Sequence, residues 1–307
     1  ACCELSVHSQ EAPVSSAEIP VFSAGTKAAT RVSGADAENA LAQHCPGLLS
    51  FSADLFSSNK NYLKGMGDFS AKDYTGRNFW CGIREHAMAA IANGVAYDGI
   101  FRVSCGTFCV FVDYMRAAIR VAALSHLPVT YVLTHDSVAV GEDGPTHQPV
   151  ETVSGLRIIP NLDVIRPADE EEAAGAWICA LRRRQGPTAL ILTRQNVPSL
   201  TASCPELSAE TRRQGTRKGA YIALKEKTAT PRLIIIATGS EVYLALEAAK
   251  QLGDDVRVVS MPSMFRFNLQ DAAYKEEVLP AACKRRIAIE AGKSDLWYRY
   301  VGPKGAI

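Results

Sequence analysis

The feature that most constrains this chain is a regular alternation between short apolar runs and helical patterns. A segment such as residues 128–136, "PVTYVLTHD", is short and mostly apolar without strict alternation, which is typical of a strand buried on both faces. A segment such as residues 169–184, "DEEEAAGAWICALRRR", is helical in pattern, with acids at its start and arginines at its end. This alternation predicts a parallel sheet with helices on both faces. The predicted strands are 47–55, 100–104, 128–136, 162–167 and 188–195, and the predicted helices are 27–45, 84–99, 107–127 and 169–184.

A second α/β pattern follows a polar stretch. Residues 204–231 are polar and weakly patterned, so they are interpreted as a linker. Residues 232–261 then resume the order strand, turn, helix and strand, and one more strand follows before the sequence stops. The predicted organisation is a tail (1–17), a first α/β domain (18–203), the linker, and a second α/β domain (232–307) that is incomplete.

Composition and charge argue against several classes of protein. The 307 residues are 47% hydrophobic and 21% charged, and a formal net charge of +1 is unlike the strongly basic surface of a nucleic-acid-binding protein. No apolar run has the length of a membrane span, and residues 1–20 lack the regions of a secretory signal. Nine irregularly spaced cysteines without a C-x-x-C motif predict reduced thiols. We therefore expect a cytoplasmic protein, with the plastid stroma as the alternative, and neither nucleic acid nor membrane as a partner.

One loop concentrates groups that can do chemistry. Residues 134–149, "THDSVAVGEDGPTHQP", contain two of the six histidines together with two acids, and the glycines and prolines exclude a helix. The loop leaves the carboxyl end of a predicted strand, and Asp54 and Arg194 lie at the carboxyl ends of two others. Because ligands bind beyond the carboxyl ends of parallel strands, we expect these side chains to converge on one rim of the sheet. The alternative is a solvated loop whose histidines hydrogen-bond neighbouring backbone groups.

A metal site is the weaker interpretation of this loop. Histidine and carboxylate side chains are metal ligands, but His135 and His147 are widely spaced on an irregular segment. The sequence contains neither an H-E-x-x-H motif nor a closely spaced pair of histidines. We therefore expect no metal ligand in this chain.

Six longer strings of the sequence resemble transketolases. They are "SADLFSSN", "GIREHAMAAIANG", "GTFCVFVDYMRAAIR", "THDSVAVGEDGPTHQP", "IRPAD" and "PTALILTRQN", and they occur in the family's order. The resemblance covers about residues 22–307. It implies transfer of a two-carbon ketol group from a ketose phosphate to an aldose phosphate, in the pentose phosphate pathway or the reductive pentose cycle. It also implies thiamine diphosphate and Mg²⁺ or Ca²⁺ as cofactors, with residues 18–203 as the pyrimidine-binding domain.

The resemblance implies cofactor-binding roles for five residues. Glu85, in "REH", matches the carboxyl group that hydrogen-bonds a nitrogen of the cofactor's pyrimidine ring. Phe108, Phe111 and Tyr114 recur every three residues in the predicted helix 107–127 and match an aromatic wall around that ring, a use that suits aromatic stacking. Asp54 matches a site residue near the cofactor. Without the resemblance, the aromatic residues would be assigned to the core and Glu85 to an ordinary first turn of a helix.

The resemblance also implies substrate-binding roles for the loop. His135 and His147 match histidines that hydrogen-bond oxygens of the ketose and of the reacting intermediate, and Asp143 matches an acid that binds a sugar hydroxyl. Such groups orient a substrate and stabilise developing negative charge on oxygen. The expected catalytic residues are Glu85, His135 and His147.

Three further residues match the family's phosphate-binding group. They are Arg31, Ser58 and Arg194. The planar guanidinium group of arginine binds phosphate through two parallel hydrogen bonds, which suits this role. Each of the three could instead be an ordinary surface residue.

The family's diphosphate-binding domain has no counterpart in this sequence. That domain holds the diphosphate and the metal through a G-D-G…N motif, and no G-D-G occurs in the 307 residues. We therefore expect the chain to supply the pyrimidine half of the site and to be inactive without a diphosphate-binding domain from the same or another chain. The expected assembly is a homodimer or a split heteromeric enzyme. The incomplete second domain favours a fragment of a longer protein.

Other functions remain as alternatives. Deoxyxylulose-phosphate synthase, dihydroxyacetone synthase and the 2-oxo-acid dehydrogenases use the same cofactor. The loop and the basic residues argue against the dehydrogenases, which handle simple 2-oxo acids. A different class of function is a non-catalytic transketolase-like subunit that only binds a partner. The intact set Glu85, His135, Asp143 and His147 argues against that role.

Overall fold

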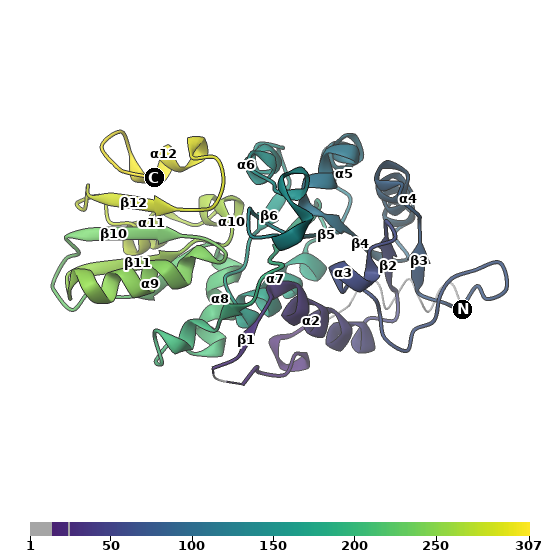
Figure 1. Ribbon diagram of the computed structural model, residues 1–307, viewed down its shortest axis with the longest axis horizontal. Coiled ribbons are helices and arrows are strands. Elements are labelled where there is room, and N and C mark those ends of the chain that lie inside the picture. Colours follow the sequence, from purple (N-terminus) through teal and green to yellow (C-terminus); the bar gives the residue numbers. More distant parts are fainter. Residues whose placement is uncertain (1–13, 24) are drawn as a thin grey trace.

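Six strands form one parallel sheet in the computed structural model, which describes residues 14–23 and 25–307 (Figure 1). Their order is β3-β2-β4-β5-β7-β6, and every neighbouring pair is parallel. The bounds are β2 (Leu48–Ser52), β3 (Asn78–Trp80), β4 (Arg102–Phe108), β5 (Val129–Thr134), β6 (Asp163–Ile165) and β7 (Thr188–Leu192). Every residue of β2, β4, β5, β6 and β7 is buried, which explains their continuous apolar patterns. The predicted parallel α/β fold is confirmed.

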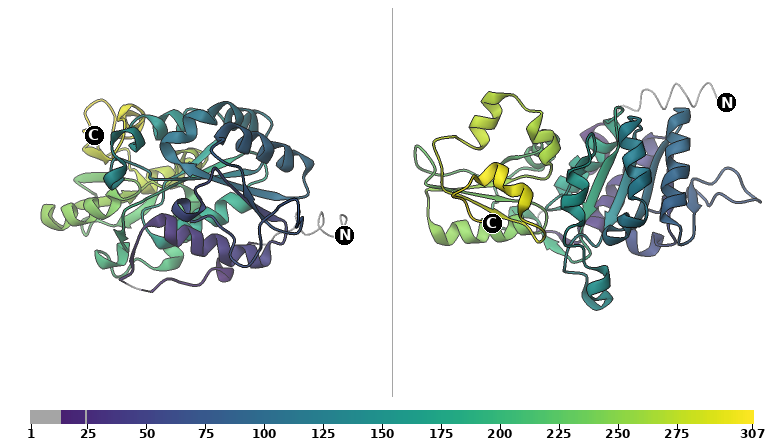
Figure 2. Two further views of the ribbon diagram at one scale, coloured as in Figure 1. Left: turned by 45° about the vertical axis from the view of Figure 1, so that its right-hand side comes forward. Right: turned by 90° about the horizontal axis from the view of Figure 1, so that it is seen from above.

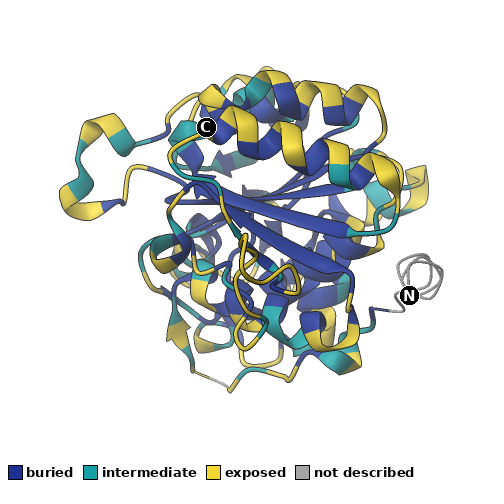
Figure 3. Cartoon of the chain, turned by 90° about the vertical axis from the view of Figure 1, so that its right-hand side faces the viewer, coloured by how far each residue is buried: buried dark blue, intermediate teal, exposed yellow. Residues whose placement is uncertain are grey.

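Helices cover both faces of this sheet (Figure 1). The first face carries α4 (Glu85–Asp98), α5 (Arg116–Leu124) and α6 (Thr152–Arg157), and the second carries α2 (Thr30–His44) and α7 (Glu170–Arg182). Met88 and Ile119 belong to the core under the first face, and Leu41 and Trp177 belong to the core under the second. In Figure 3 the strands are buried and the helices expose their outer sides. The sheet therefore separates two apolar cores and leaves its carboxyl edge for function.

The predicted helix 107–127 is wrong in its first half. Thr107 and Phe108 end strand β4, the 3-10 helix η2 (Cys109–Tyr114) follows, and regular helix begins only at α5. Phe108 has extended dihedrals, φ -68° and ψ 149°, and it pairs with Thr134 of β5. The β4–β5 ladder thus continues through Phe108, and its hydrogen bonds override the helical spacing of the aromatic residues.

The start of α2 also differs from the prediction. Lys27–Ala28 form strand β1, which pairs antiparallel with β8 (Val197–Pro198), so the helix begins at Thr30. Thr26 donates its hydroxyl to the Ser23 carbonyl in the preceding turn. The side-chain oxygen of Thr193 accepts a hydrogen bond from the Thr30 N–H at 2.8 Å. A residue just after β7 therefore satisfies one of the unpaired amides at the start of α2.

The segment interpreted as a linker, 204–231, contains helix α8 (Ala209–Lys218) and strand β9 (Tyr221–Leu224). Arg212 and Arg213 of α8 are buried, and both pair with acids at the start of α7. The pairs join Arg212 to Asp169 and Glu170, and Arg213 to Glu171. The charges that suggested a solvated connector therefore form a buried ion-pair network between two helices, and this network explains why the polar pattern concealed a helix.

The second domain is built on a four-stranded sheet of order β12-β10-β11-β9. Strands β10 to β12 are parallel and β9 is antiparallel. The strand–helix–strand order predicted for residues 232–261 is confirmed by β10, α9 and β11. The bounds are β10 (Leu233–Ala237), α9 (Glu241–Leu252), β11 (Val256–Ser260), α10 (Met264–Asn268), α11 (Ala272–Val278), β12 (Arg286–Ile289), η6 (Asp295–Trp297) and α12 (Tyr298–Val301).

The amino-terminal residues are only partly described. Of the predicted tail, residues 1–13 lie outside the described residues, but Val14 is 2% exposed and its carbonyl accepts a hydrogen bond from Arg182 Nε at 2.6 Å. The short helix η1 (Ser16–Glu18) follows. The seven cysteines within the described part are all free thiols. Across residues 14–23 and 25–307, no helix combines the length and the apolar character needed to cross a membrane.

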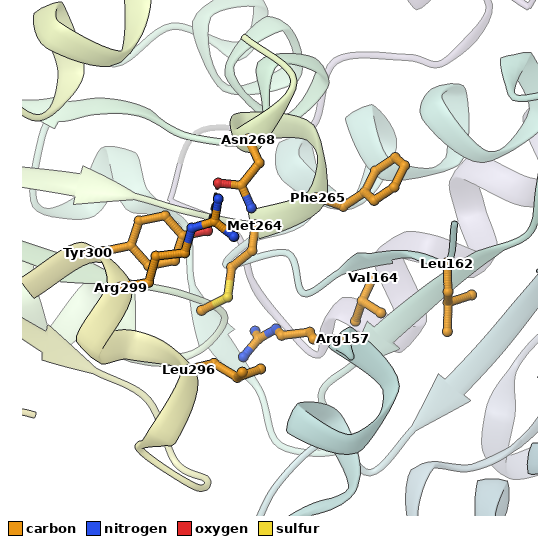
Figure 4. A pocket seen from close by; sticks show the side chains of 9 residues that line it. All are labelled: Arg157, Leu162, Val164, Met264, Phe265, Asn268, Leu296, Arg299 and Tyr300. Carbon is orange, nitrogen blue, oxygen red and sulfur yellow. Dashed lines mark hydrogen bonds between the residues drawn. The ribbon is translucent and has the colours of Figure 1, made fainter. Parts of the chain in front are cut away.

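The two domains lie side by side and meet at a buried charge cluster (Figure 2). Arg166, just after β6, pairs with Asp136 of the first domain and Glu241 of the second. A cavity of about 150 Å³ lies between α6 and β6 on one side and α10 and α12 on the other (Figure 4). It is lined by Arg157, Leu162, Val164, Met264, Phe265, Asn268, Leu296, Arg299 and Tyr300, and no predicted site residue is among them.

Candidate functional site

The carboxyl ends of the central strands present the predicted site residues. Asp54 follows β2, Phe108 ends β4, His135 follows β5 and Arg194 follows β7. Asp54 and His135 have positive φ angles of 63° and 61°. Residues other than glycine rarely adopt this conformation, which costs of order 1 kcal/mol or more and is often found at functional sites. At both residues the strained backbone turns away from the sheet just after the strand ends. This happens at the rim that the sequence predicted.

His135 is the most enclosed member of the site. Its side chain is 3% exposed, and its ring stacks on Phe108 with centroids 3.7 Å apart. Nδ1 lies 2.9 Å from Thr134 Oγ1, and Nε2 lies 3.7 Å from Asp143 Oδ2. Burial and the nearby charge of Arg31 lower the pKa of His135 to about 4, although Asp143 opposes this shift. His135 is therefore neutral near pH 7 and can hydrogen-bond a ligand without carrying a charge.

The shape of the loop depends on two glycines. It contains two 3-10 turns, η3 (Gly141–Asp143) and η4 (Pro145–His147), and Gly141 and Gly144 have φ angles of 72° and 76°. At both positions a side chain would be strained. A Cβ at Gly141 would also lie 3.1 Å from the guanidinium group of Arg194. This folding brings Asp143 and His147 back toward the histidine that begins the loop.

The three predicted aromatic residues lie beside the histidines and form an aromatic wall, but they do not come from one helix as the sequence predicted. Phe108 comes from the end of β4, whereas Phe111 and Tyr114 come from η2. The rings of Phe108 and Phe111 are nearly parallel, with centroids 5.8 Å apart, and Tyr114 follows 6.0 Å from Phe111. His147 meets Phe111 edge to face at 5.2 Å. Phe108 is buried and Tyr114 is 68% exposed, so the wall runs from the interior to the surface.

Glu85 is the first residue of α4 and is 7% exposed. Thr107, the neighbour of Phe108, donates a long hydrogen bond of 3.3 Å to Glu85 Oε1. The carboxyl group therefore lies beside the aromatic wall and retains acceptor capacity for a further partner. The structure thus brings the predicted carboxyl group and the predicted wall together.

The predicted phosphate-binding residues also meet, though not all through the expected atoms. Arg31 Nη1 donates to the backbone carbonyl of Ser58 at 2.7 Å, so the contact does not use the serine hydroxyl. Arg31 Nε is buried without a partner. Burial lowers the pKa of Arg31, the positive charge of Arg194 lowers it further, and Asp143 opposes both. Arg194 is held by Glu142 at 3.2 Å, an exposed partner that the sequence analysis did not identify. Two arginines close to each other form a site suited to an anion.

Asp54 is the least connected of the predicted residues. It is exposed at the end of β2. Burial raises the pKa of the Cys81 thiol to about 11, and the negative charge of Asp54 contributes to this rise. Within the described part of the chain, no group of three or more histidine, cysteine and acidic residues is arranged to hold a metal ion.

Three buried polar residues near the site were missed by the sequence analysis. Thr134 Oγ1 lies 2.9 Å from the side-chain amide of Asn59, directly behind His135. Asp136, on the other side of His135, is held by Arg166 at 2.7 Å. Asn59 ends the four-residue helix α3 (Phe56–Asn59), which is too short for a periodic signal. Only Asp136, because it is adjacent to a site histidine in the sequence, could have been selected as a candidate.

Two protein families match most of the chain. Residues 26–199 match the family described as "Transketolase, pyrimidine binding domain", and residues 219–307 match the "Transketolase-like TK C-terminal domain". A transketolase from Physarum polycephalum is 59% identical over 289 residues, which are 94% of this chain and 43% of the relative. A transketolase from Pichia stipitis, solved in complex with sedoheptulose-7-phosphate, has a TM-score of 0.90 at 37% identity. The match covers 99% of this chain and 46% of that chain.

A further solved chain is similar to this one over most of both lengths. It is described as a split-gene transketolase, an inactive beta4 tetramer, and it has a TM-score of 0.68 at 24% identity. The match covers 92% of this chain and 88% of that chain. This likeness shows the fold. Against the curated relative from Physarum polycephalum, in contrast, the chain spans less than half the length.

Proposed function

The chain belongs to the transketolase family, and we propose that it supplies the pyrimidine-binding half of a thiamine-diphosphate site for ketol transfer. The proposed reaction moves a two-carbon ketol group from a ketose phosphate to an aldose phosphate. The main observation behind the proposal is a group of side chains that lie together at the rim of the sheet. A neutral imidazole, an acid and two arginines act on one another beside an aromatic wall.

The aromatic wall and Glu85 fit the pyrimidine ring of thiamine diphosphate. The rings of Phe108 and Phe111 are nearly parallel and offset, which is a suitable surface for a flat heterocycle. Glu85 is buried beside them and has one long hydrogen bond, so its carboxyl group can pair with a ring nitrogen. When bound, the cofactor supplies the nucleophilic carbon that accepts the ketol group.

The loop residues would bind the sugar. His135 and His147 hydrogen-bond oxygens of the ketose, and Asp143 accepts a hydrogen bond from a sugar hydroxyl. A neutral His135 suits this work because it can orient a hydroxyl without attracting a second anion into the site. The buried, unpartnered Nε of Arg31 and the adjacent charge of Arg194 support a phosphate group at this end of the site.

The diphosphate and its cation, Mg²⁺ or Ca²⁺, would be held by a diphosphate-binding domain from the same protein or another chain. Exposed large apolar side chains support such a contact. Ile83 is 83% exposed just before α4, while Ile91 and Tyr97 on α4 are 52% and 79% exposed. Tyr114 of the aromatic wall is also exposed, and large apolar side chains of this kind can be buried against another domain. We propose a homodimer of the longer protein or a split heteromeric enzyme as the assembly.

A reducing compartment is part of the same proposal. The free cysteines in the described part of the chain support a cytoplasmic location, with the plastid stroma as the alternative.

Reconstitution tests the proposed function. The 307-residue chain is combined, by mixing and separately by fusion, with the diphosphate-binding half of a related transketolase, and ketol transfer is followed with saturating cofactor and Mg²⁺. We expect turnover from the combination and none from either part alone. A fusion that folds and binds thiamine diphosphate but transfers no ketol group from any ketose phosphate would contradict the proposal.

A further inference from the structure

A chain of three buried polar side chains runs behind the loop of the site. Asn59, Thr134 and His135 are 1%, 0% and 3% exposed. The hydroxyl oxygen of Thr134 lies 2.9 Å from the amide of Asn59 and 2.9 Å from Nδ1 of His135. The three residues come from α3, the end of β5 and the first position of the loop. One hydroxyl group therefore connects a buried amide to the imidazole that faces the site.

The single proton of this hydroxyl couples the two hydrogen bonds. If Thr134 donates to the Asn59 carbonyl, it must accept from Nδ1–H, and Nε2 of His135 then carries no proton. If Thr134 donates to Nδ1, it accepts from the Asn59 amide nitrogen, and the proton of the neutral imidazole lies on Nε2. A half-turn of the Asn59 amide interchanges these two arrangements and moves no other heavy atom.

Two observations select the second arrangement. With the Asn59 carbonyl turned toward Thr134, the amide nitrogen of Asn59 is buried without a hydrogen-bond partner. An orphaned buried N–H group is rarer in proteins than an under-used carbonyl. In addition, Nε2 of His135 lies 3.7 Å from a carboxylate oxygen of Asp143. An unprotonated Nε2 would face this oxygen as a second acceptor, whereas Nε2–H faces it as a donor.

We propose that Asn59 and Thr134 are positioning residues that hold neutral His135 as its Nε2–H tautomer. His135 then donates a hydrogen bond from Nε2 to a substrate oxygen next to Asp143. The identity of that substrate, a sugar phosphate, rests on the proposed function, but the tautomer does not. Specificity follows from the direction of the bond. A fixed N–H group donates to an oxygen lone pair at this position and disfavours a substrate group that can only donate.

The tautomer can be measured in the chain itself. Long-range ¹H–¹⁵N correlation spectra distinguish protonated from unprotonated ring nitrogens of histidine, and the signals of His135 are identified by their loss in His135→Gln. At neutral pH we expect a proton on Nε2 and none on Nδ1 of His135. A dominant Nδ1–H form in the folded parent chain would overturn the proposal, whatever the variants show.

A matched pair of substitutions tests the role of the hydroxyl. Thr134→Ser keeps a hydroxyl group, whereas Thr134→Val keeps the branched shape and removes the relay. A hydrogen bond of ordinary strength corresponds to about a 2- to 12-fold change in an equilibrium. We therefore expect Thr134→Val to lower the ratio of Nε2–H to Nδ1–H by about this factor and Thr134→Ser to keep the parent ratio. Equal ratios in both variants would contradict a relay.

Activity provides a separate readout in the reconstituted enzyme. Thr134→Val is expected to reduce kcat/KM for the ketose phosphate by about 2- to 12-fold. Thr134→Ser is expected to retain the parent value. If the reconstituted parent transfers no ketol group, the proposed function is overturned while the spectra still decide the tautomer. If the parent is active and its His135 is the Nδ1–H form, this inference alone is overturned.

Discussion

The imidazole ring of His135 lies on the phenyl ring of Phe108, with centroids 3.7 Å apart and an angle of 28° between the planes. One face of Phe108 is therefore occupied by a residue of the same site. The contact contributes to the burial that lowers the pKa of His135 to about 4. Phe108 thus has two functions in the site. It belongs to the aromatic wall, and it excludes water from His135 and so favours the neutral imidazole.

Replacing Phe108 should therefore change the titration of His135. We expect Phe108→Leu to admit water and to raise the pKa of His135 from about 4 toward its ordinary value of 6.5. Phe111→Leu is the matched control, since Phe111 stacks on Phe108 and contacts His147 rather than His135. The pKa of His135 in each variant is measured by following its NMR signals as a function of pH. Equal shifts in the two variants would show that the stacking contact does not set the pKa.

The lowered pKa of His135 also predicts a pH dependence of stability. Between pH 6.5 and about pH 4 the unfolded chain binds more protons at this residue than the folded chain. The free energy of unfolding should therefore fall as the pH decreases through this window and receive no further change from His135 below it. One pKa unit corresponds to about 1.4 kcal/mol, so the whole contribution is at most about 3.5 kcal/mol.

His135→Gln should remove this part of the pH dependence. Urea unfolding is measured for the parent chain and the variant at several values between pH 4 and pH 7, and the two free energies of unfolding are compared. His44→Gln is the control, because His44 is exposed at the end of α2. The interpretation fails if the His135 and His44 variants follow the same curve.

Glu85 should be required for cofactor activation rather than for folding. Glu85→Gln preserves the shape of the side chain and a neighbour for Thr107, but an amide cannot share a carboxyl proton with a ring nitrogen. In the reconstituted enzyme we expect exchange of the reactive cofactor proton to slow by about 10²–10⁴-fold. Circular dichroism and cofactor affinity are followed in parallel. Exchange at the parent rate would remove Glu85 from this role.

Much of the fold could be predicted from local pattern because the strongest elements are also the most regular. Helix α4 and strand β5 were found within a few residues of their bounds. Prediction failed where a distant contact decides the structure. Residues 107–127 have helical spacing, yet pairing with β5 keeps Phe108 extended. Residues 204–231 look solvated, yet Arg212 and Arg213 are buried in ion pairs with acids at the start of α7. The local sequence pattern does not contain these acids.

The candidate site was predicted through resemblance and through the position of the loop after a strand. The structure brings most of the predicted residues together, and Arg31 and His135 act on each other although they are far apart in the sequence. The supporting residues were missed for a physical reason. Asn59 and Thr134 have no motif, since their importance comes only from burial and from one shared proton. Asp54 was predicted from resemblance, and its cofactor role stays a prediction.

The ion pairs between α7 and α8 should be important for stability. Arg213 is buried and donates to Glu171 at 2.5 Å and to the carbonyl of Ile19 at 3.0 Å. Arg213→Met should lower the free energy of unfolding by about 3–5 kcal/mol, because it leaves the Glu171 carboxylate buried and unpaired. The double variant Arg213→Met/Glu171→Gln should recover part of this loss.

Arg217→Met provides the control for this measurement. Arg217 lies on the same helix and hydrogen-bonds Gln214 at the surface, so its loss should change stability by less than about 0.5 kcal/mol. All variants are compared by urea unfolding at one pH. A small effect of Arg213→Met, similar to that of Arg217→Met, would show that the buried pair is not needed for stability.

The last prediction concerns the phosphate group of the substrate. Burial and the positive charge of Arg194 lower the pKa of Arg31, and Arg31 Nε has no partner. An anion between them would relieve the repulsion and satisfy the donor. A charge-assisted hydrogen bond contributes about 1.5–3 kcal/mol. Arg194→Ala should therefore lower kcat/KM for a phosphorylated ketose by about 10- to 150-fold in the reconstituted enzyme.

A ketose without phosphate separates this role from a structural one. Such a donor never uses the contact, so Arg194→Ala and Arg31→Ala should leave its kcat/KM nearly unchanged. Arg194→Lys should give an intermediate loss on the phosphorylated donor, since lysine keeps the charge but lacks the planar fork. Arg120→Ala, an exposed arginine of α5, should affect neither donor. If the Arg31 and Arg194 variants lose activity equally on both donors, these arginines support the structure of the site, and the phosphate assignment is wrong.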